Sequence, residues 1–163
     1  MKPVVTHYEP FCESLPITQD IAALLPHAAP MILIDSLLES TENVLLCRAN
    51  SHLKADNPLR IDGVLSVFAG VEYAAQAMAV HGRLSREATA SPPVRGFVAV
   101  ASKLEAHAEQ LDAIASPLQI RVERVASNHD SSLYTFSLHA EQQLLLEGQL
   151  MAVLEAAENT TGF

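Results

Sequence analysis

The sequence predicts an α+β fold in which an antiparallel β-sheet wraps around one long apolar helix. The helix is indicated by residues 63–82, where nearly every residue is apolar or small and a glycine stands at each end. Two strand-like segments precede this stretch and four follow it, so helix and strands occupy separate parts of the chain. Because apolar residues lie on all sides of the predicted helix, we expect the rest of the protein to enclose it.

The part of the chain before the long helix predicts a short helix and two strands. Prolines keep residues 1–17 irregular. A short helix is expected from Thr18, a suitable N-cap, to about Leu25. The apolar residues 31–34 follow a proline and predict a buried strand, and residues 43–49 predict a second. A short polar turn joins these strands, so they should pair antiparallel.

The part of the chain after residue 50 predicts a loop, the long helix and four strands. A polar loop at residues 51–62 leads to the helix, which we expect to weaken beyond Gly82. Apolar and polar residues then alternate, as in strands with one buried face. Gly148, within the last strand, predicts a bulge or a close approach of neighbouring atoms. The four strands are expected within residues 94–106, near 118–122, near 134–138 and within 144–154.

The composition is that of a folded domain. Of 163 residues, 49% are hydrophobic and 18% are charged, which fits a single domain spanning residues 1–163 with its core at about 20–155. The net charge of −9 argues against nucleic acid or an anionic membrane as a partner. No signal sequence follows Met1, so a cytoplasmic location is expected.

The cysteines and histidines show no metal-binding spacing. No glycine-rich phosphate loop is present either, so we expect neither a metal nor a cofactor. Cys12 and Cys47 are far apart, and Cys47 is expected to be a buried free thiol. His81 is expected near the helix end, where a cation is favoured. Four further histidines are expected at the surface: His7, His107, His129 and His139.

Glu72 is the unusual residue of the predicted helix. A glutamate in an apolar helix is rarely buried unless it is paired or functional, and burial would raise its pKa towards the range useful for proton transfer. Gln76, one turn later on the same face, could hydrogen-bond to it. The alternative is that Glu72 lies on a thin solvated seam. Because the helix is predicted to begin near Gly63, Glu72 is expected well inside it, away from the helix N-terminus.

These motifs together resemble a known family. The order L-P-H-x-x-P-M-I-L-I-D, then a helix carrying E-x-x-A-Q-A-M-A, then four strands is similar to the hotdog-fold 3-hydroxyacyl-[acyl-carrier-protein] dehydratases over about residues 20–155. The helix sequence E-Y-A-A-Q-A-M-A-V-H-G is most similar to a divergent subgroup found with aryl-polyene and related fatty-acid-like pathways. The resemblance implies a hotdog fold and removal of water from a (3R)-3-hydroxyacyl thioester on acyl carrier protein.

The resemblance also implies a set of site residues. The family uses an acidic residue on the helix, which corresponds to Glu72, and a loop histidine, usually brought together across a dimer interface. Gln76 and His27 match the family's glutamine and the histidine of its L-P-H segment. The position of the family's usual loop histidine corresponds to Pro58, where this chain has no histidine. The nearest histidines upstream are His52 and then His27, so these two are the candidate bases.

Two glycines are expected to contribute to substrate binding. Gly70 would let a backbone or the thioester approach closely, or would serve packing alone. Gly63 stands at the predicted start of the helix.

Three functions remain open on the sequence. The first is a dehydratase-like enzyme of acyl-carrier thioesters, and the second is a hotdog thioesterase that uses the helix carboxylate as base or nucleophile. The third is a non-catalytic subunit that completes a dehydratase heterodimer or binds acyl chains. The expected partners are acyl carrier protein and a second hotdog subunit, in a homodimer or heterodimer joined by sheet edges. Docking of the acidic carrier is expected to use the basic residues Lys54, Arg60, Arg83, Arg86 and Arg95.

Overall fold

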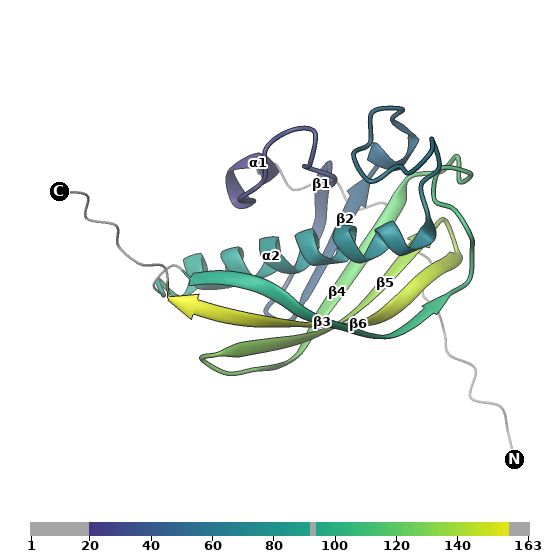
Figure 1. Ribbon diagram of the computed structural model, residues 1–163. Helices are drawn as coiled ribbons and strands as arrows, with labels where there is room; N and C mark the ends of the chain where they lie inside the picture. The colour runs from purple at the N-terminus through teal and green to yellow at the C-terminus, as the bar shows by residue number, and fades with distance from the viewer. Residues whose placement is uncertain (1–19, 92–93, 157–163) are drawn as a thin grey trace, which may run out of the picture.

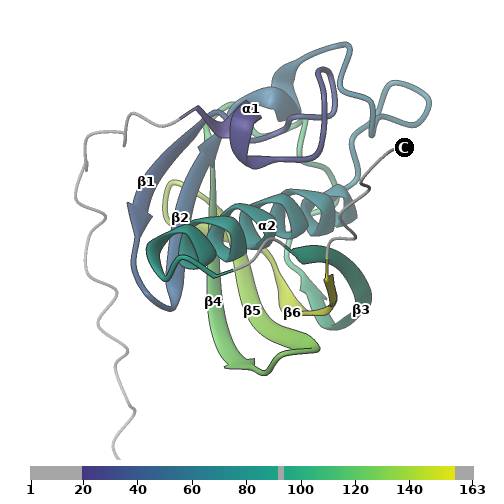
Figure 2. The same cartoon turned by 90° about the vertical axis from the view of Figure 1, so that its left-hand side faces the viewer.

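A computed structural model describes residues 20–91 and 94–156 and shows one antiparallel sheet curled around one long helix (Figures 1 and 2). The sheet has six strands in the order β1-β2-β4-β5-β6-β3, and every neighbouring pair is antiparallel. The helices are α1 (Ile21–Leu24) and α2 (Gly70–Ala88). The strands are β1 (Ser36–Ser40), β2 (Val44–Ala49), β3 (Val94–Ala106), β4 (Leu118–Ser127), β5 (Ser131–Ala140) and β6 (Gln143–Ala156). The predicted architecture is confirmed.

The long helix begins and ends later than predicted. Gly63 lies in a turn with φ +78°, and Ser66 forms a β-bridge with Gln110. Ser66 also caps a short 3-10 turn, Val67–Ala69, by accepting a hydrogen bond from the backbone N–H of Phe68. Pairing with a distant segment therefore keeps these apolar residues out of the helix, and α2 starts at Gly70. At the other end the helix runs through Gly82 to Ala88.

Helix α2 packs against the concave face of the sheet (Figure 2). Its buried residues include Tyr73, Ala74, Ala77 and Val80. The expectation that the helix is enclosed on all sides is wrong, because a stripe at helical spacing stays partly or fully exposed. This stripe runs along Glu72, Ala75, Ala79, Arg83 and Arg86.

Gly70 is closely packed at the start of α2. A Cβ atom at this position would lie 2.7 Å from a methyl carbon of Leu138 and 2.9 Å from one of Leu146. Gly148 is similarly constrained, since a Cβ there would lie 2.6 Å from Leu104 and 3.1 Å from the carbonyl oxygen of Ser102. The packing alternative for Gly70 and the close approach predicted at Gly148 are both observed.

Two of the predicted early elements differ from the structure. The predicted strand at 31–34 is an irregular segment, and the first strand begins at Ser36. The backbone N–H of Leu33 donates to the Gln76 side chain, and its carbonyl accepts from Ser51, so side chains replace strand pairing there. The short helix α1 is capped by Asp20, which accepts from the backbone N–H of Ala22. The predicted N-cap Thr18 lies outside the described residues.

Several predictions about single side chains are now decided. Cys47 is a buried free thiol, and burial raises its pKa to about 12. The surface prediction is confirmed for His107 and His129 but wrong for His139, which is buried. His81 is also buried, inside α2 rather than at its end, where Nδ1 lies 2.8 Å from the Tyr134 hydroxyl and Nε2 lies 3.0 Å from the carbonyl oxygen of Thr41. Cys12 and His7 lie outside the described residues.

Strand β3 forms an uncovered edge of the sheet. It pairs with β6 on one side, and no strand of the described chain pairs with its other side. Its apolar side chains are unusually accessible: Phe97 is 52%, Val98 41%, Val100 44% and Leu104 36% exposed. Within residues 20–91 and 94–156, no helix is both long and apolar enough to cross a bilayer.

Candidate active site

Gln76 joins the L-P-H segment to the first turns of α2. Its side chain is 1% exposed. Its Oε1 accepts a hydrogen bond from the backbone N–H of Leu33 at 3.0 Å, and its Nε2 donates to the carbonyl oxygen of Met31 at 2.6 Å. The same Nε2 lies 3.4 Å from Oε1 of Glu72, so the predicted contact between these two residues is present. One buried amide therefore fixes the irregular segment and orients the carboxylate.

Glu72 and His27 face each other at the surface of this assembly. Nε2 of His27 lies 3.7 Å from Oε1 of Glu72, and the two side chains are 34% and 33% exposed. The expectation of a fully buried Glu72 is wrong, and the solvated-seam alternative describes its surroundings. The expectation that Glu72 lies well inside the helix is also wrong, because it belongs to the first turn of α2. The N-terminal end of a helix carries the positive end of the helix dipole, which favours a nearby negative charge.

His27 has two differently placed ring nitrogens. Nε2 faces Glu72, whereas Nδ1 is buried and has no hydrogen-bond partner in the part of the chain that the structure describes. A neutral imidazole carries one donor and one acceptor nitrogen, and a partner at one nitrogen normally fixes which is which. Because no described protein group bonds to Nδ1, neither tautomer of His27 is fixed from that side. Nε2 can therefore act as donor or as acceptor towards Glu72 or a ligand.

The pair opens into a cavity of about 1400 Å³. Glu72, Ala75 and Ala79 line it from the exposed stripe of α2, and further apolar walls come from the neighbouring strands. Arg86 lines the same cavity fourteen residues beyond Glu72, about 21 Å along the helix axis. The wall at that far end is basic and carries Arg83, Arg86, Arg95 and Arg124. An extended, mainly apolar chain with a polar terminus fits these dimensions and linings.

A buried polar network supports the site from behind. The hydroxyl of Tyr73, which is 0% exposed, lies 2.7 Å from Ser51 Oγ and accepts a hydrogen bond from Asn57 at 3.1 Å. Ser51 in turn donates to the carbonyl oxygen of Leu33 at 2.7 Å. Burial raises the pKa of Tyr73. The network ties the loop after β2 to the segment that Gln76 holds. Sequence patterns missed it because its members are isolated polar residues in loops and inside the helix.

His52 does not join Glu72 in this chain. It is fully buried rather than solvated, and its Nε2 lies 2.9 Å from the carbonyl oxygen of Ile114. Burial lowers its pKa. His52 is not among the residues that line the cavity. Its contacts hold two loops together instead.

Gly63 and Arg60 also lie away from the cavity. Arg60 donates to the carbonyl oxygen of Gly63 at 2.8 Å and forms an ion pair with Asp112 at 3.0 Å. Its side chain is only 15% exposed. These contacts occupy Arg60, so it is poorly placed for carrier docking, whereas three of the other expected docking residues line the cavity: Arg83, Arg86 and Arg95.

Comparison with known proteins adds family and fold. A model of the ApeP-like family, described as ApeP dehydratase, matches residues 19–161. A search of curated proteins found no match. A structure of the dehydratase heterocomplex ApeI:P from Xenorhabdus doucetiae is similar, with a TM-score of 0.72 and 20% identity over 90% of this chain and 93% of that chain.

Two thioesterase structures share the fold at lower similarity. The one from Haemophilus influenzae has a TM-score of 0.58 and 9% identity over 78% of this chain and 82% of that chain. A mutant thioesterase from Pseudomonas aeruginosa has a TM-score of 0.56 and 9% identity over 75% of this chain and 81% of that chain. At such identities the likeness shows the fold alone, and the predicted hotdog fold is confirmed.

Proposed function

Because the chain belongs to the ApeP-like dehydratase family, we propose that it takes part in removing water from (3R)-3-hydroxyacyl thioesters carried by acyl carrier protein. The observation that carries the proposal is the Glu72–His27 pair, 3.7 Å apart at the wall of a cavity of about 1400 Å³. We further propose a cytoplasmic location, as the sequence predicts.

The reaction needs one acid and one base. The base removes a proton from C2, the electrons of that C–H bond form the C2=C3 double bond, and the C3–O bond breaks. The departing hydroxyl takes a proton from the acid and leaves as water. In the proposal the protonated carboxyl of Glu72 is the acid and a neutral histidine is the base.

His27 is the histidine that the described part of the chain places beside Glu72. Gln76 holds both partners, because it bonds to the segment of His27 and contacts Glu72 itself. The neutral form of His27 can accept the C2 proton at Nε2, the nitrogen that faces the carboxyl.

We propose that a second hotdog subunit covers strand β3. The exposed apolar side chains of this edge, Phe97, Val98 and Val100, need such a cover. The similar structure from Xenorhabdus doucetiae is of the dehydratase heterocomplex ApeI:P, which supports a heterodimer over a homodimer. This chain carries Pro58 at the sequence position of the family's loop histidine. In such a complex the partner can therefore supply a histidine to the site of Glu72.

Hydrolysis of the thioester is the second candidate. The carboxyl of Glu72 is one-third exposed and therefore accessible to water, which it could activate for attack on the thioester carbon.

The test measures turnover of a synthetic (3R)-3-hydroxyacyl carrier thioester. The protein is assayed alone and after co-expression with hotdog proteins encoded near it, as wild type and as Glu72→Gln and His27→Asn variants. Glu87→Gln serves as the control, since Glu87 lies on the same helix in an exposed ion pair with Arg83. Mass spectrometry separates loss of water from loss of the acyl group.

We expect the wild type to dehydrate the substrate. Glu72→Gln should reduce the rate of dehydration by at least about 100-fold, the usual contribution of a general acid, and Glu87→Gln should leave the rate unchanged. Release of the acyl group would favour the thioesterase. An active complex that tolerates Glu72→Gln would make this chain a non-catalytic subunit and refute the assigned role of Glu72.

A further inference from the structure

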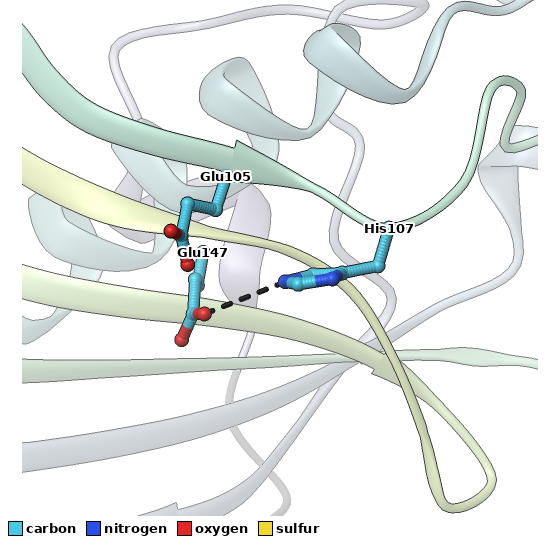
Figure 3. Close-up of side chains that lie close together, drawn as sticks. All are labelled: Glu105, His107 and Glu147. Atoms are coloured by element: carbon cyan, nitrogen blue, oxygen red, sulfur yellow. Dashed lines mark hydrogen bonds and ion pairs between the residues drawn. The ribbon is translucent and has the colours of Figure 1, made fainter.

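Three potential metal ligands from two neighbouring strands lie together on the sheet surface, away from the candidate active site. Glu105 belongs to β3, His107 follows the end of β3, and Glu147 belongs to β6 (Figure 3). One ligand atom from each residue lies within 4.8 Å of the others. We propose that this Glu105–His107–Glu147 cluster is a divalent-cation site that binds Zn²⁺.

The distance between two of the ligand atoms fits a shared metal ion. Two atoms bound to a tetrahedral zinc ion at about 2.0–2.1 Å lie roughly 3.3–3.4 Å from each other. Nε2 of His107 lies 3.4 Å from Oε1 of Glu147, which is long for a hydrogen bond between a ring N–H and a carboxylate. The nitrogen and the oxygen therefore already have the separation of two ligands around one ion.

The backbone holds the cluster in place. The N–H of His107 donates to the carbonyl oxygen of Leu145 at 2.9 Å, so the histidine continues the β3–β6 pairing beyond the strand end. Glu105 is the direct cross-strand partner of Glu147, and alternation along the strand puts Glu105 and His107 on one face. Ligands on paired strands need little movement to close on an ion.

The strand is irregular next to this cluster. The register of β3 against β6 shifts between Ser102 and Glu105, and Lys103 there has φ +52°, a left-handed conformation that costs energy for a residue other than glycine. Bulges re-aim side chains and are common beside functional sites. Here the shift brings Glu105 opposite Glu147.

Two carboxylates in direct cross-strand positions repel each other unless a cation lies between them. Among the described residues, no lysine or arginine forms an ion pair with Glu105 or Glu147; Glu147 pairs with His107 and also interacts electrostatically with the buried His139. Side chains of His107 and Glu147 are 43% and 41% exposed, which leaves room for water to complete the coordination. A divalent ion would remove the repulsion and join the edge strand to its neighbour.

The cluster could not be found from sequence spacing. His107 and Glu147 are 40 residues apart in the sequence. The expectation of no metal rested on motifs whose ligands are only a few residues apart, and such motifs do not detect a cluster formed by strand pairing. The site also lies outside the residues that line the Glu72 cavity, so it goes beyond the proposed function.

Zinc titration of the metal-free, full-length protein without an affinity tag tests the proposal. Isothermal titration calorimetry should give one Zn²⁺ per chain. His107→Asn and Glu147→Gln should each weaken binding by at least about tenfold. His129→Asn is the matched control, because His129 also forms an exposed pair with a carboxylate, Asp130, at 3.1 Å but belongs to no described three-ligand group.

Glu105→Gln gives a second readout that a merely structural residue would not produce. It should weaken zinc binding and yet raise the melting temperature of the metal-free protein, because it removes the repulsion between cross-strand carboxylates. Circular dichroism checks that each variant is folded. Lack of stoichiometric binding, or equal zinc affinity in wild type, His107→Asn and Glu147→Gln, would overturn the proposal, as would loss of binding in His129→Asn.

Discussion

Replacing Gln76 with alanine should destabilise the protein and detach the His27 segment from α2. The buried amide satisfies the backbone N–H of Leu33 and the carbonyl of Met31. Each of these backbone groups would lose its partner inside the protein, at a cost of about 1–3 kcal/mol apiece. The expected loss in free energy of unfolding is therefore about 2–6 kcal/mol. For a chain of this size, a loss of about 4 kcal/mol lowers the melting temperature by about 8–16 °C.

Urea unfolding of wild type and Gln76→Ala measures this loss. Gln76→Glu is the informative comparison, because a carboxylate keeps the acceptor for Leu33 but removes the donor to Met31 and adds a charge beside Glu72. We expect Gln76→Glu to be destabilised as well and to lose turnover together with Gln76→Ala. If the free energy of unfolding of Gln76→Ala falls by less than about 1 kcal/mol, the backbone groups of Leu33 and Met31 have found other hydrogen-bond partners. The role assigned to Gln76 would then be wrong.

Three further predictions concern stability and assembly. Gly70→Ala should cost about 1–3 kcal/mol in urea unfolding, since its Cβ would enter the space of two leucine side chains; an unchanged midpoint would show that the leucines move freely. Burial lowers the pKa of three histidines, so the unfolded chain binds more protons and stability should fall as the pH drops below about 6.5. These histidines are His52, His81 and His139. Equal urea midpoints at pH 7.5 and pH 5.5 would contradict the expected loss of stability. Val100→Asp on the β3 edge should abolish co-elution with a hotdog partner, whereas Val125→Asp should not, although Val125 on β4 is 50% exposed and Val100 44%; equal behaviour of the two variants in size-exclusion chromatography would place the interface elsewhere.

The sequence by itself determined the architecture and the central acid–amide contact. Alternation with a period of two marks strands, and the middle of a long apolar run marks a helix, because both signals come from residues close together in the chain. Glu72 and Gln76 are one turn apart on any helix, so their contact follows from local geometry. The range predicted for β3, residues 94–106, agrees with the structure for the same reason.

Tertiary structure decided where the helix starts and what surrounds its acid. The bridge between Ser66 and Gln110 holds the preceding apolar residues outside α2, which puts Glu72 in the first turn. His27 reaches Glu72 because Gln76 binds backbone groups more than forty residues away in the sequence.

Burial of single polar residues likewise depended on the whole fold. His81 lies on the side of α2 that faces the sheet, where its Nδ1 forms a hydrogen bond with the hydroxyl of Tyr134 on β5. His139 is enclosed on β5, whereas His107, at the end of the edge strand, stays exposed. Local pattern gives the side of an element on which a residue lies, but the partner across the sheet is set by topology, which brings together residues far apart in the chain.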